Sequence, residues 1–186
     1  DAFALGNHEF DSGDAGLVKF IDCLHADPKT CKTPILSANL KAGGNALKSR
    51  VAPYTTIKRD GQKIGIVGIT VAYKTKHASR PDEATSFDDE VASAQAAIDA
   101  LKTQGIDKIV LMTHQGYAAD VAMAPKLSGV DVIVGGDSHT LLGPDSLKNY
   151  GLTPSGAYPT QSVDKDGKKV CIGQAWEYGK AFGLMK

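Results

Sequence analysis

The chain has 186 residues, which is enough for one domain with a full hydrophobic core. Lysine plus arginine and aspartate plus glutamate number 21 each, so the formal net charge at pH 7 is zero. Proteins whose main partner is a nucleic acid polymer usually carry a basic excess, so this balance argues against such a partner. No apolar run is long enough for a membrane-spanning helix, and the sequence predicts no membrane span.

The first half of the chain is predicted to contain short strands, loops and one helix. The expected strands are residues 1–5, 35–40, 54–57 and 63–70. Loops are expected over residues 41–50 and 74–87. A helical apolar pattern begins near Gly16 and places Leu17, Phe20, Ile21 and Leu24 on one face. Asp60-Gly61 separates two of the strands and predicts a tight hairpin turn, because both residue types accept a positive φ.

The second half alternates helices with buried strands. Helices are expected over residues 88–104 and 118–127. The expected strands are residues 107–113, 130–134, 158–162, 169–173 and 174–185. Continuous apolar runs are typical of parallel strands covered on both faces, so the pattern predicts an α/β fold with right-handed crossovers. Asp166-Gly167 predicts a second hairpin rather than a calcium loop, because the ligands that should follow are missing.

The cysteines bear on the cellular compartment. Cys23 and Cys31 flank a polar stretch that could close a small disulfide ring. Cytosolic proteins rarely keep such a bond, so a disulfide here would indicate a periplasmic or extracellular protein. Two free thiols near a helix end are the alternative, and both remain open. Cys171 lies in an apolar strand and is expected to be a small core residue.

Three of the expected strands end in clusters of polar residues. The clusters occupy residues 6–11, 113–116 and 135–139. Ligands bind beyond the carboxyl ends of the strands in an open α/β sheet, so the three clusters are expected to face one another. Glycines beside each cluster allow the backbone to turn sharply and to approach a ligand closely.

These clusters contain three of the five histidines, together with two aspartates and an asparagine. A single histidine or asparagine after a strand is more often a cap or a turn residue than a metal ligand. The coincidence at three strand ends favours a site instead. Histidine, aspartate and asparagine without cysteine suit divalent ions such as Zn, Mn, Co or Fe. His25 and His77 fall in predicted loops and are expected to take no part.

The stretch Gly-Asn-His-Glu-Phe-Asp at residues 6–11 resembles the Gly-Asn-His-Glu/Asp motif of the calcineurin-like metallophosphoesterases. Its extended form is similar to the branch of 5′-nucleotidases, NAD nucleotidases and UDP-sugar hydrolases. The agreement continues in order through residues 36–39, 113–114, 135–139 and 174–179, and so covers nearly the whole chain. The resemblance implies a metallophosphoesterase-type αββα sandwich of mixed sheets that lacks its first strands.

The resemblance also implies metal ligands. Asn7, His114 and Asp137 match ligands of one metal, and His139 matches a ligand of the second. Most members of the family have a histidine where this chain has Asp137. The Gly-Asp-Ser-His sequence around it is similar to a variant in NAD-nucleotidase-like members. The expected cofactors are therefore two divalent ions per intact active site.

Catalytic roles are implied for two further residues of the first motif. His8 matches the catalytic histidine, and Asp11 would orient it and favour its imidazolium form. The activity implied is hydrolysis of the phosphate esters of nucleotides by a dinuclear metal centre that activates water. NAD, UDP-sugars and 2′,3′-cyclic nucleotides are alternative substrates. A degenerate, non-catalytic module of the same fold is the alternative from another functional class.

Two motifs of the family pattern, an Asp-x-His pair and a bridging Gly-Asp, are expected upstream of residue 1. A C-terminal substrate-binding domain is expected after residue 186. Residues 1–186 are therefore predicted to be a partial catalytic domain. Alone, this stretch is expected to bind at most one metal weakly and to be inactive. The longer protein is expected to be periplasmic or extracellular.

Overall fold

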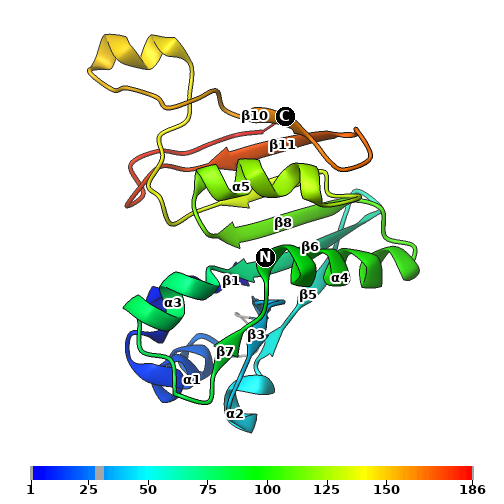
Figure 1. The fold of residues 1–186 in the computed structure, drawn as a ribbon, viewed down its shortest axis with the longest axis vertical. Helices are drawn as coiled ribbons and strands as arrows, with labels where there is room; N and C mark the ends of the chain where they lie inside the picture. Colours follow the sequence, from blue (N-terminus) through cyan, green and yellow to red (C-terminus); the bar gives the residue numbers. More distant parts are fainter. Residues whose placement is uncertain (1, 28–31, 186) are drawn as a thin grey trace.

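Two β-sheets pack together at the centre of the computed structural model, which describes residues 2–27 and 32–185 (Figure 1). The larger sheet has the order β10-β11-β9-β8-β6-β5. Its strands are β5 (Tyr54–Arg59), β6 (Gln62–Thr70), β8 (Ile109–His114), β9 (Val132–Gly135), β10 (Thr160–Val163) and β11 (Lys169–Gln174). The four inner strands are parallel, whereas β5 and β10 pair antiparallel at the edges. This arrangement confirms the predicted parallel core.

The smaller sheets lie beside the larger one. Three short parallel strands form one of them, β1 (Phe3–Ala4), β2 (Ile35–Leu36) and β4 (Val51–Ala52). The strands β3 (Leu40–Lys41) and β7 (Ser86–Phe87) form an antiparallel pair. Both β1 and β2 pack against β6 of the larger sheet. The α/β class with mixed sheets is therefore as predicted.

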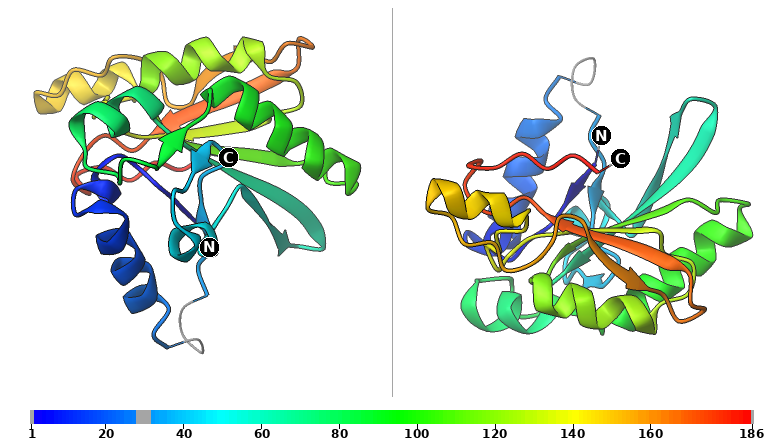
Figure 2. Two further views of the ribbon diagram at one scale, coloured as in Figure 1. Left: turned by 60° about the horizontal axis from the view of Figure 1, so that its bottom comes forward. Right: turned by 90° about the horizontal axis from the view of Figure 1, so that it is seen from above.

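Helices cover the two sheets from opposite sides (Figure 2). The helix α4 (Glu90–Thr103) and the helix α5 (Tyr117–Met123) lie against the larger sheet, and α1 (Gly13–Leu24) lies against the smaller one. The remaining helices are α2 (Asn45–Lys48), α3 (Ala72–Ala78) and the 3₁₀ turns η1 (His8–Phe10), η2 (Ala124–Lys126) and η3 (Asp145–Tyr150). Each side has its own hydrophobic core, with Ile98 and Leu111 in one and Phe10 and Leu17 in the other.

Both predicted hairpins are confirmed. Asp60 and Gly61 have φ values of 47° and 75°, as a primed turn between β5 and β6 requires. In the second hairpin, the carboxylate of Asp164 accepts hydrogen bonds from the backbone N–H groups of Asp166 and Lys168. Both bonds go to Asp164 Oδ1 and hold it within the turn, as expected for a hairpin rather than a calcium loop.

Four predicted loops or strands are wrong. A turn at residues 38–39 divides the predicted strand over 35–40 into β2 and β3, which belong to different sheets. The predicted loop over 41–50 contains α2, whose single turn is too short to show helical periodicity. The polar segment 74–87 contains most of α3 and all of β7, because tertiary contacts rather than an apolar pattern stabilise them. The predicted strand over 174–185 ends at Gln174 apart from an isolated bridge at Ala175. Trp176 and Tyr178 have positive φ values of 58° and 47°, which a strand cannot contain.

Individual side chains also differ from expectation. Phe20, predicted on the apolar face of α1, is 44% exposed and packs on Phe3. Cys171 is half-buried beside Gln161 rather than in the core. Cys23 is exposed, whereas Cys31 lies outside the described residues, so the predicted pair remains a prediction. Within residues 2–27 and 32–185, no helix has the length and apolar character needed to cross a membrane.

Gly68 in β6 allows the two sheets to approach closely. A Cβ atom at this position would lie 2.5 Å from Leu36 Cβ and 2.6 Å from the Leu36 carbonyl oxygen in β2. The Gly68 carbonyl also accepts a 2.7 Å hydrogen bond from the N–H of Ala38. No side chain larger than hydrogen fits between the strands, so this glycine sets the spacing of the sheets.

Asp120 is a buried carboxylate in α5 that faces the ends of β8 and β9. Its Oδ1 accepts hydrogen bonds from Thr113 Oγ1 at 2.7 Å and from Gln115 Nε2 at 2.9 Å. Its Oδ2 has no hydrogen-bond partner in the described part of the chain and packs against Gly135. Burial raises the pKa of Asp120 to about 6, and the two hydrogen bonds oppose that shift.

Gly68→Ala should destabilise the chain by about 1–3 kcal/mol, because the added methyl group overlaps Leu36. Urea unfolding followed by circular dichroism measures the change. Gly44→Ala is the matched control, because a Cβ atom at Gly44 meets nothing within 4 Å and should leave the stability nearly unchanged. Equal stability of the two variants would contradict the close approach of β2 and β6.

Asp120 should make the stability of the chain fall as the pH rises. Its folded pKa of about 6 lies above the model value of 3.8, so its proton favours the folded state below pH 4. That contribution, about 3 kcal/mol, is lost as the pH passes through 6. Urea unfolding between pH 4 and 8 should show that Asp120→Asn removes this slope. Asp60→Asn, in an exposed turn, should keep it. If the free energy of unfolding changed with pH equally in Asp120→Asn and in the unsubstituted chain, Asp120 would not be the source of the slope.

Candidate active site

The loop after β1 carries the first predicted cluster and turns through the short 3₁₀ helix η1. Asn7 is only 2% exposed, and its Nδ2 donates a 3.3 Å hydrogen bond to Ser79 Oγ. Its Oδ1 is buried and has no hydrogen-bond partner among the described residues. A buried amide oxygen without a donor is costly, and a bound cation would satisfy it. This oxygen is therefore a candidate metal ligand.

His8 and Asp11 form a pair at the surface of the same loop. His8 Nδ1 lies 2.7 Å from Asp11 Oδ2, and both side chains are more than half exposed. The hydrogen bond from His8 is the main cause that lowers the pKa of Asp11, and a hydrogen bond from Ser79 adds to it. The ionised carboxylate accepts the Nδ1 proton, which leaves Nε2 as the ring nitrogen available to a ligand.

Residues that follow α3 brace this loop, and the sequence did not reveal them. Ser79 contacts both Asn7 and Asp11 through its hydroxyl group. The next residue, Arg80, donates its backbone N–H to the Phe10 carbonyl at 3.2 Å. These contacts join segments about 70 residues apart, and no local pattern in the sequence marks them.

The second and third predicted clusters meet at the ends of β8 and β9. His114 Nε2 lies 3.5 Å from Asp137 Oδ1. Burial lowers the pKa of His114, although the charge of Asp137 acts in the opposite direction. The lowered pKa favours the neutral imidazole, which is the form that binds metals.

The first cluster lies against His114. A Cβ atom on Gly6 would be 2.9 Å from His114 Nε2 and Cδ2, so only glycine lets the loop that carries Asn7 approach this ring. The structure therefore brings Gly6 together with His114 and Asp137, although more than 100 residues separate Gly6 from the other two. This juxtaposition is what the strand-end argument predicted.

Lys74 of α3 forms an ion pair with Asp137 that was not expected from the sequence. Its Nζ contacts Asp137 Oδ1, the same oxygen that faces His114. Asp137 is largely buried, with a side-chain exposure of 13%, so the ammonium group compensates a carboxylate charge that has lost much of its water. Lys74 lies in the segment predicted to be a loop, where nothing distinguishes it from its charged neighbours.

His139 follows two residues after Asp137 and has a separate set of neighbours. Its Nδ1 lies 3.4 Å from Glu177 Oε2, and its ring packs edge-on against Tyr178. A carboxylate at Nδ1 orients the ring and leaves Nε2 for a ligand. His25 and His77 contact the backbone carbonyls of Thr33 and Tyr73 through one ring nitrogen each.

The donor set fits one divalent ion. Among the residues that the structure describes, no three histidine, cysteine, aspartate or glutamate side chains come close enough to hold a metal by themselves. The buried Asn7 amide oxygen is the candidate third donor, because Asn7 directly follows Gly6, which lies against His114. One amide oxygen, one imidazole and one carboxylate are ligands that Zn, Mn, Co and Fe accept. His139 does not add to this group in the described structure.

Comparison with known proteins identifies relatives over nearly the whole chain. No protein-family model matches. A probable 5′-nucleotidase of Treponema pallidum is 38% identical over 184 residues, which cover 98% of this chain and 30% of that protein. The NAD 5′-nucleotidase of Haemophilus influenzae is 40% identical over 182 residues, which cover 97% of this chain and 29% of that protein. The chain thus spans about a third of the length of these relatives.

Solved structures of nucleotidases also superpose on this chain. The crystal structure of a 5′-nucleotidase precursor from Thermus thermophilus superposes with a TM-score of 0.87 at 42% identity, over 96% of this chain and 34% of that one. The NAD nucleotidase of Haemophilus influenzae superposes with a TM-score of 0.84 at 38% identity, over 94% of this chain and 34% of that one. The fold, the strand-end motifs and these similarities lead to one conclusion: the chain belongs to the 5′-nucleotidase family of metallophosphoesterases.

Proposed function

We propose that the protein hydrolyses phosphate esters of nucleotides with the help of bound divalent metal ions. The observation that carries this proposal is the buried Asn7 Oδ1, which has no partner among the described residues and directly follows Gly6, the residue that lies against His114. The relatives named 5′-nucleotidase support the choice of substrate class. An intact His8–Asp11 pair on the same loop supports an active enzyme over the alternative of a degenerate, non-catalytic module.

Asn7, His114 and Asp137 would hold one metal ion, and His139 would contribute to a second. A metal pair of this kind polarises a phosphate ester and lowers the pKa of a bound water. The second ion would need ligands beyond those in this chain, because His139 is one donor alone. We infer that the Asp-x-His and Gly-Asp motifs supply them and that residues 1–186 form part of the catalytic domain.

His8 would act on the phosphate rather than on the metal. Asp11 accepts the Nδ1 proton, and in the imidazolium form of His8 that the carboxylate would favour, Nε2 can donate a hydrogen bond to a phosphoryl oxygen or to the leaving-group oxygen. Such a preoriented donor contributes about 2–4 kcal/mol to the stability of the transition state. His8 is 75% exposed at its side chain, which leaves it accessible to a substrate.

NAD is a second candidate substrate. The relative from Haemophilus influenzae is named for activity on NAD and is 40% identical to this chain. Asp137 belongs to the Gly-Asp-Ser-His sequence at residues 136–139, which is similar to a variant in NAD-nucleotidase-like members. A nucleoside pocket would lie in a C-terminal domain like the portion of the relatives that this chain does not match. A periplasmic or extracellular location is part of the same proposal.

Substitution of His8 should separate catalysis from metal binding. In the full-length gene product, His8→Ala should lower kcat for adenosine monophosphate by about 100- to 1,000-fold while the metal content stays unchanged. Asn7→Leu should instead lower the metal content, because it removes the amide oxygen. Elemental analysis and phosphate release measure both quantities, and a panel with NAD separates the two candidate substrates.

Loss of bound metal in His8→Ala would show that His8 is a ligand. Unsubstituted protein that carries its metal ions but hydrolyses no nucleotide, NAD, UDP-sugar or 2′,3′-cyclic nucleotide would favour the non-catalytic module. Asn7→Leu with full metal content would remove the observation on which the proposed site depends.

A further inference from the structure

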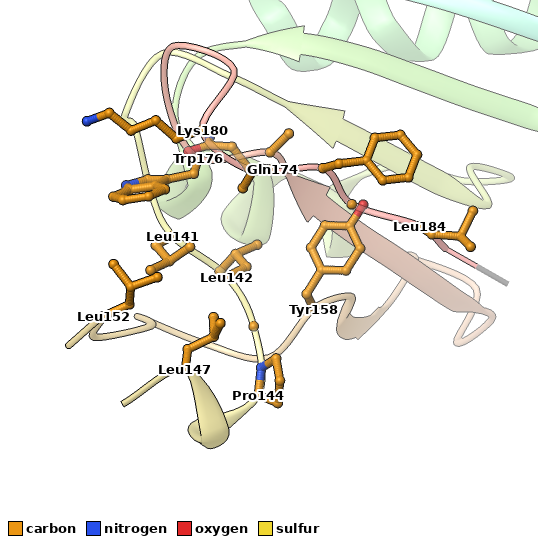
Figure 3. A pocket seen from close by; sticks show the side chains of 15 residues that line it. Leu141, Leu142, Pro144, Leu147, Leu152, Tyr158, Gln174, Trp176, Lys180 and Leu184 are labelled. Carbon is orange, nitrogen blue, oxygen red and sulfur yellow. The ribbon is translucent and has the colours of Figure 1, made fainter. Parts of the chain in front are cut away.

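Gln174 is a buried polar residue at the end of β11 whose role is not explained by the proposed chemistry. It is 3% exposed and pairs in register with Gly135 of β9. The loop that follows β9, residues 136–140, carries both Asp137 and His139. On its other side, Gln174 lines a pocket of about 360 Å³ together with apolar residues such as Leu141 and Leu142 (Figure 3).

The hydrogen bonds of the Gln174 side chain in the described structure go to this loop. Its Nε2 donates to the Gly136 carbonyl at 2.8 Å. Its Oε1 accepts from the backbone N–H of Thr140 and, at 3.3 Å, from Ser138 Oγ. One amide group therefore binds the residues before, between and after the two candidate metal ligands.

The loop needs such support because its conformation is unfavourable. Asp137 has a φ of 75° and His139 a φ of 51°, so two non-glycine residues of one short loop adopt the left-handed region. Non-glycine residues in this region are strained and persist only where surrounding contacts hold them. The Ser138 hydroxyl also accepts from the Tyr117 N–H at 3.0 Å, but Gln174 is the residue that contacts both ends of the loop.

We propose that Gln174 is a positioning residue that holds Asp137 and His139 in the geometry in which they bind metal. The inference rests on the proposed function, because it assigns Gln174 a role in the same metal site. Gln174 acts on the backbone that presents the two ligands rather than on their side chains or on a substrate. Substitution of Gln174 should therefore lower the affinity of the site for metal ions.

The matched control is Gln95 in α4. Its side chain also makes three hydrogen bonds, to the N–H and carbonyl of Ser128 and to Asp99 Oδ1. It holds a loop that contains none of the candidate ligands. Gln95→Leu and Gln174→Leu remove equivalent bonds, so they separate a general loss of stability from a specific loss of metal binding.

Calorimetric titration of the full-length gene product with Mn²⁺ tests the proposal. Gln174→Leu should weaken Mn²⁺ binding by about 10- to 100-fold, as expected when support of metal ligands is lost. Gln95→Leu should leave the affinity unchanged. In the metal-free protein, the Thr140 amide proton should exchange faster with solvent in Gln174→Leu than in Gln95→Leu, because its acceptor is gone.

Gln174→Glu adds a pH-dependent change in Mn²⁺ affinity that a general loss of stability would not produce. At pH 8 its carboxylate keeps the acceptor for Thr140 but faces the Gly136 carbonyl without a proton to donate. Because position 174 is only 3% exposed, burial should raise the pKa of the introduced carboxyl group, and its protonation as the pH falls restores that donor. The affinity of Gln174→Glu relative to the unsubstituted protein should therefore recover between pH 8 and pH 5.5, whereas the ratio for Gln174→Leu should stay constant.

The outcomes distinguish this inference from the proposed function. If the unsubstituted protein does not bind Mn²⁺, both are overturned. If it binds Mn²⁺ and Gln174→Leu binds it equally well, the positioning role alone is overturned. The same holds if Gln95→Leu weakens binding as much as Gln174→Leu does, since the effect would then follow stability.

Discussion

The hydrogen bond from Thr70 Oγ1 to the Leu5 carbonyl, 2.9 Å long, joins the two sheets where the candidate site begins. Thr70 is fully buried at the end of β6, and it pairs in register with His114 of β8. Leu5 directly precedes Gly6 and Asn7. The buried Thr70 hydroxyl therefore fixes the position of the loop that carries Asn7 relative to the strand that carries His114. The amide of Asn39 completes the junction by binding both the N–H and the carbonyl of Thr70.

Around that junction, each charged group of the candidate site has an ionic or hydrogen-bonding partner in the described structure. Asp137 has Lys74 from α3, Asp11 has His8 and Ser79, and His139 has Glu177. The Asn7 oxygen is the exception, since it is buried without a donor among the described residues. A protein interior tolerates such an oxygen poorly, so a cation is its natural partner. The Asn7 oxygen is thus the atom of the site that the proposed metal ion would satisfy.

The arrangement of strands and the identity of the candidate residues were predictable because both depend on local patterns. Apolar runs ending in glycine and a polar cluster mark strand ends, and the carboxyl ends of parallel strands share one edge. Lys74, Ser79 and Gln174 were not assigned roles because each acts across 34 to 72 positions of sequence. The helix α3 and the irregular path after Gln174 were missed for a related reason. Tertiary contacts and left-handed residues, not periodicity, determine them.

The position of a bound metal ion tests the proposed site most directly. Crystals of the full-length gene product soaked with Mn²⁺ should give an anomalous difference peak that contacts Asn7 Oδ1, His114 Nε2 and the Asp137 carboxylate. Displacement of Lys74 from Asp137 or a shared carboxylate would both agree with that result. A peak that avoids Asn7, with its Oδ1 bonded to water or to a protein donor instead, would contradict the central claim.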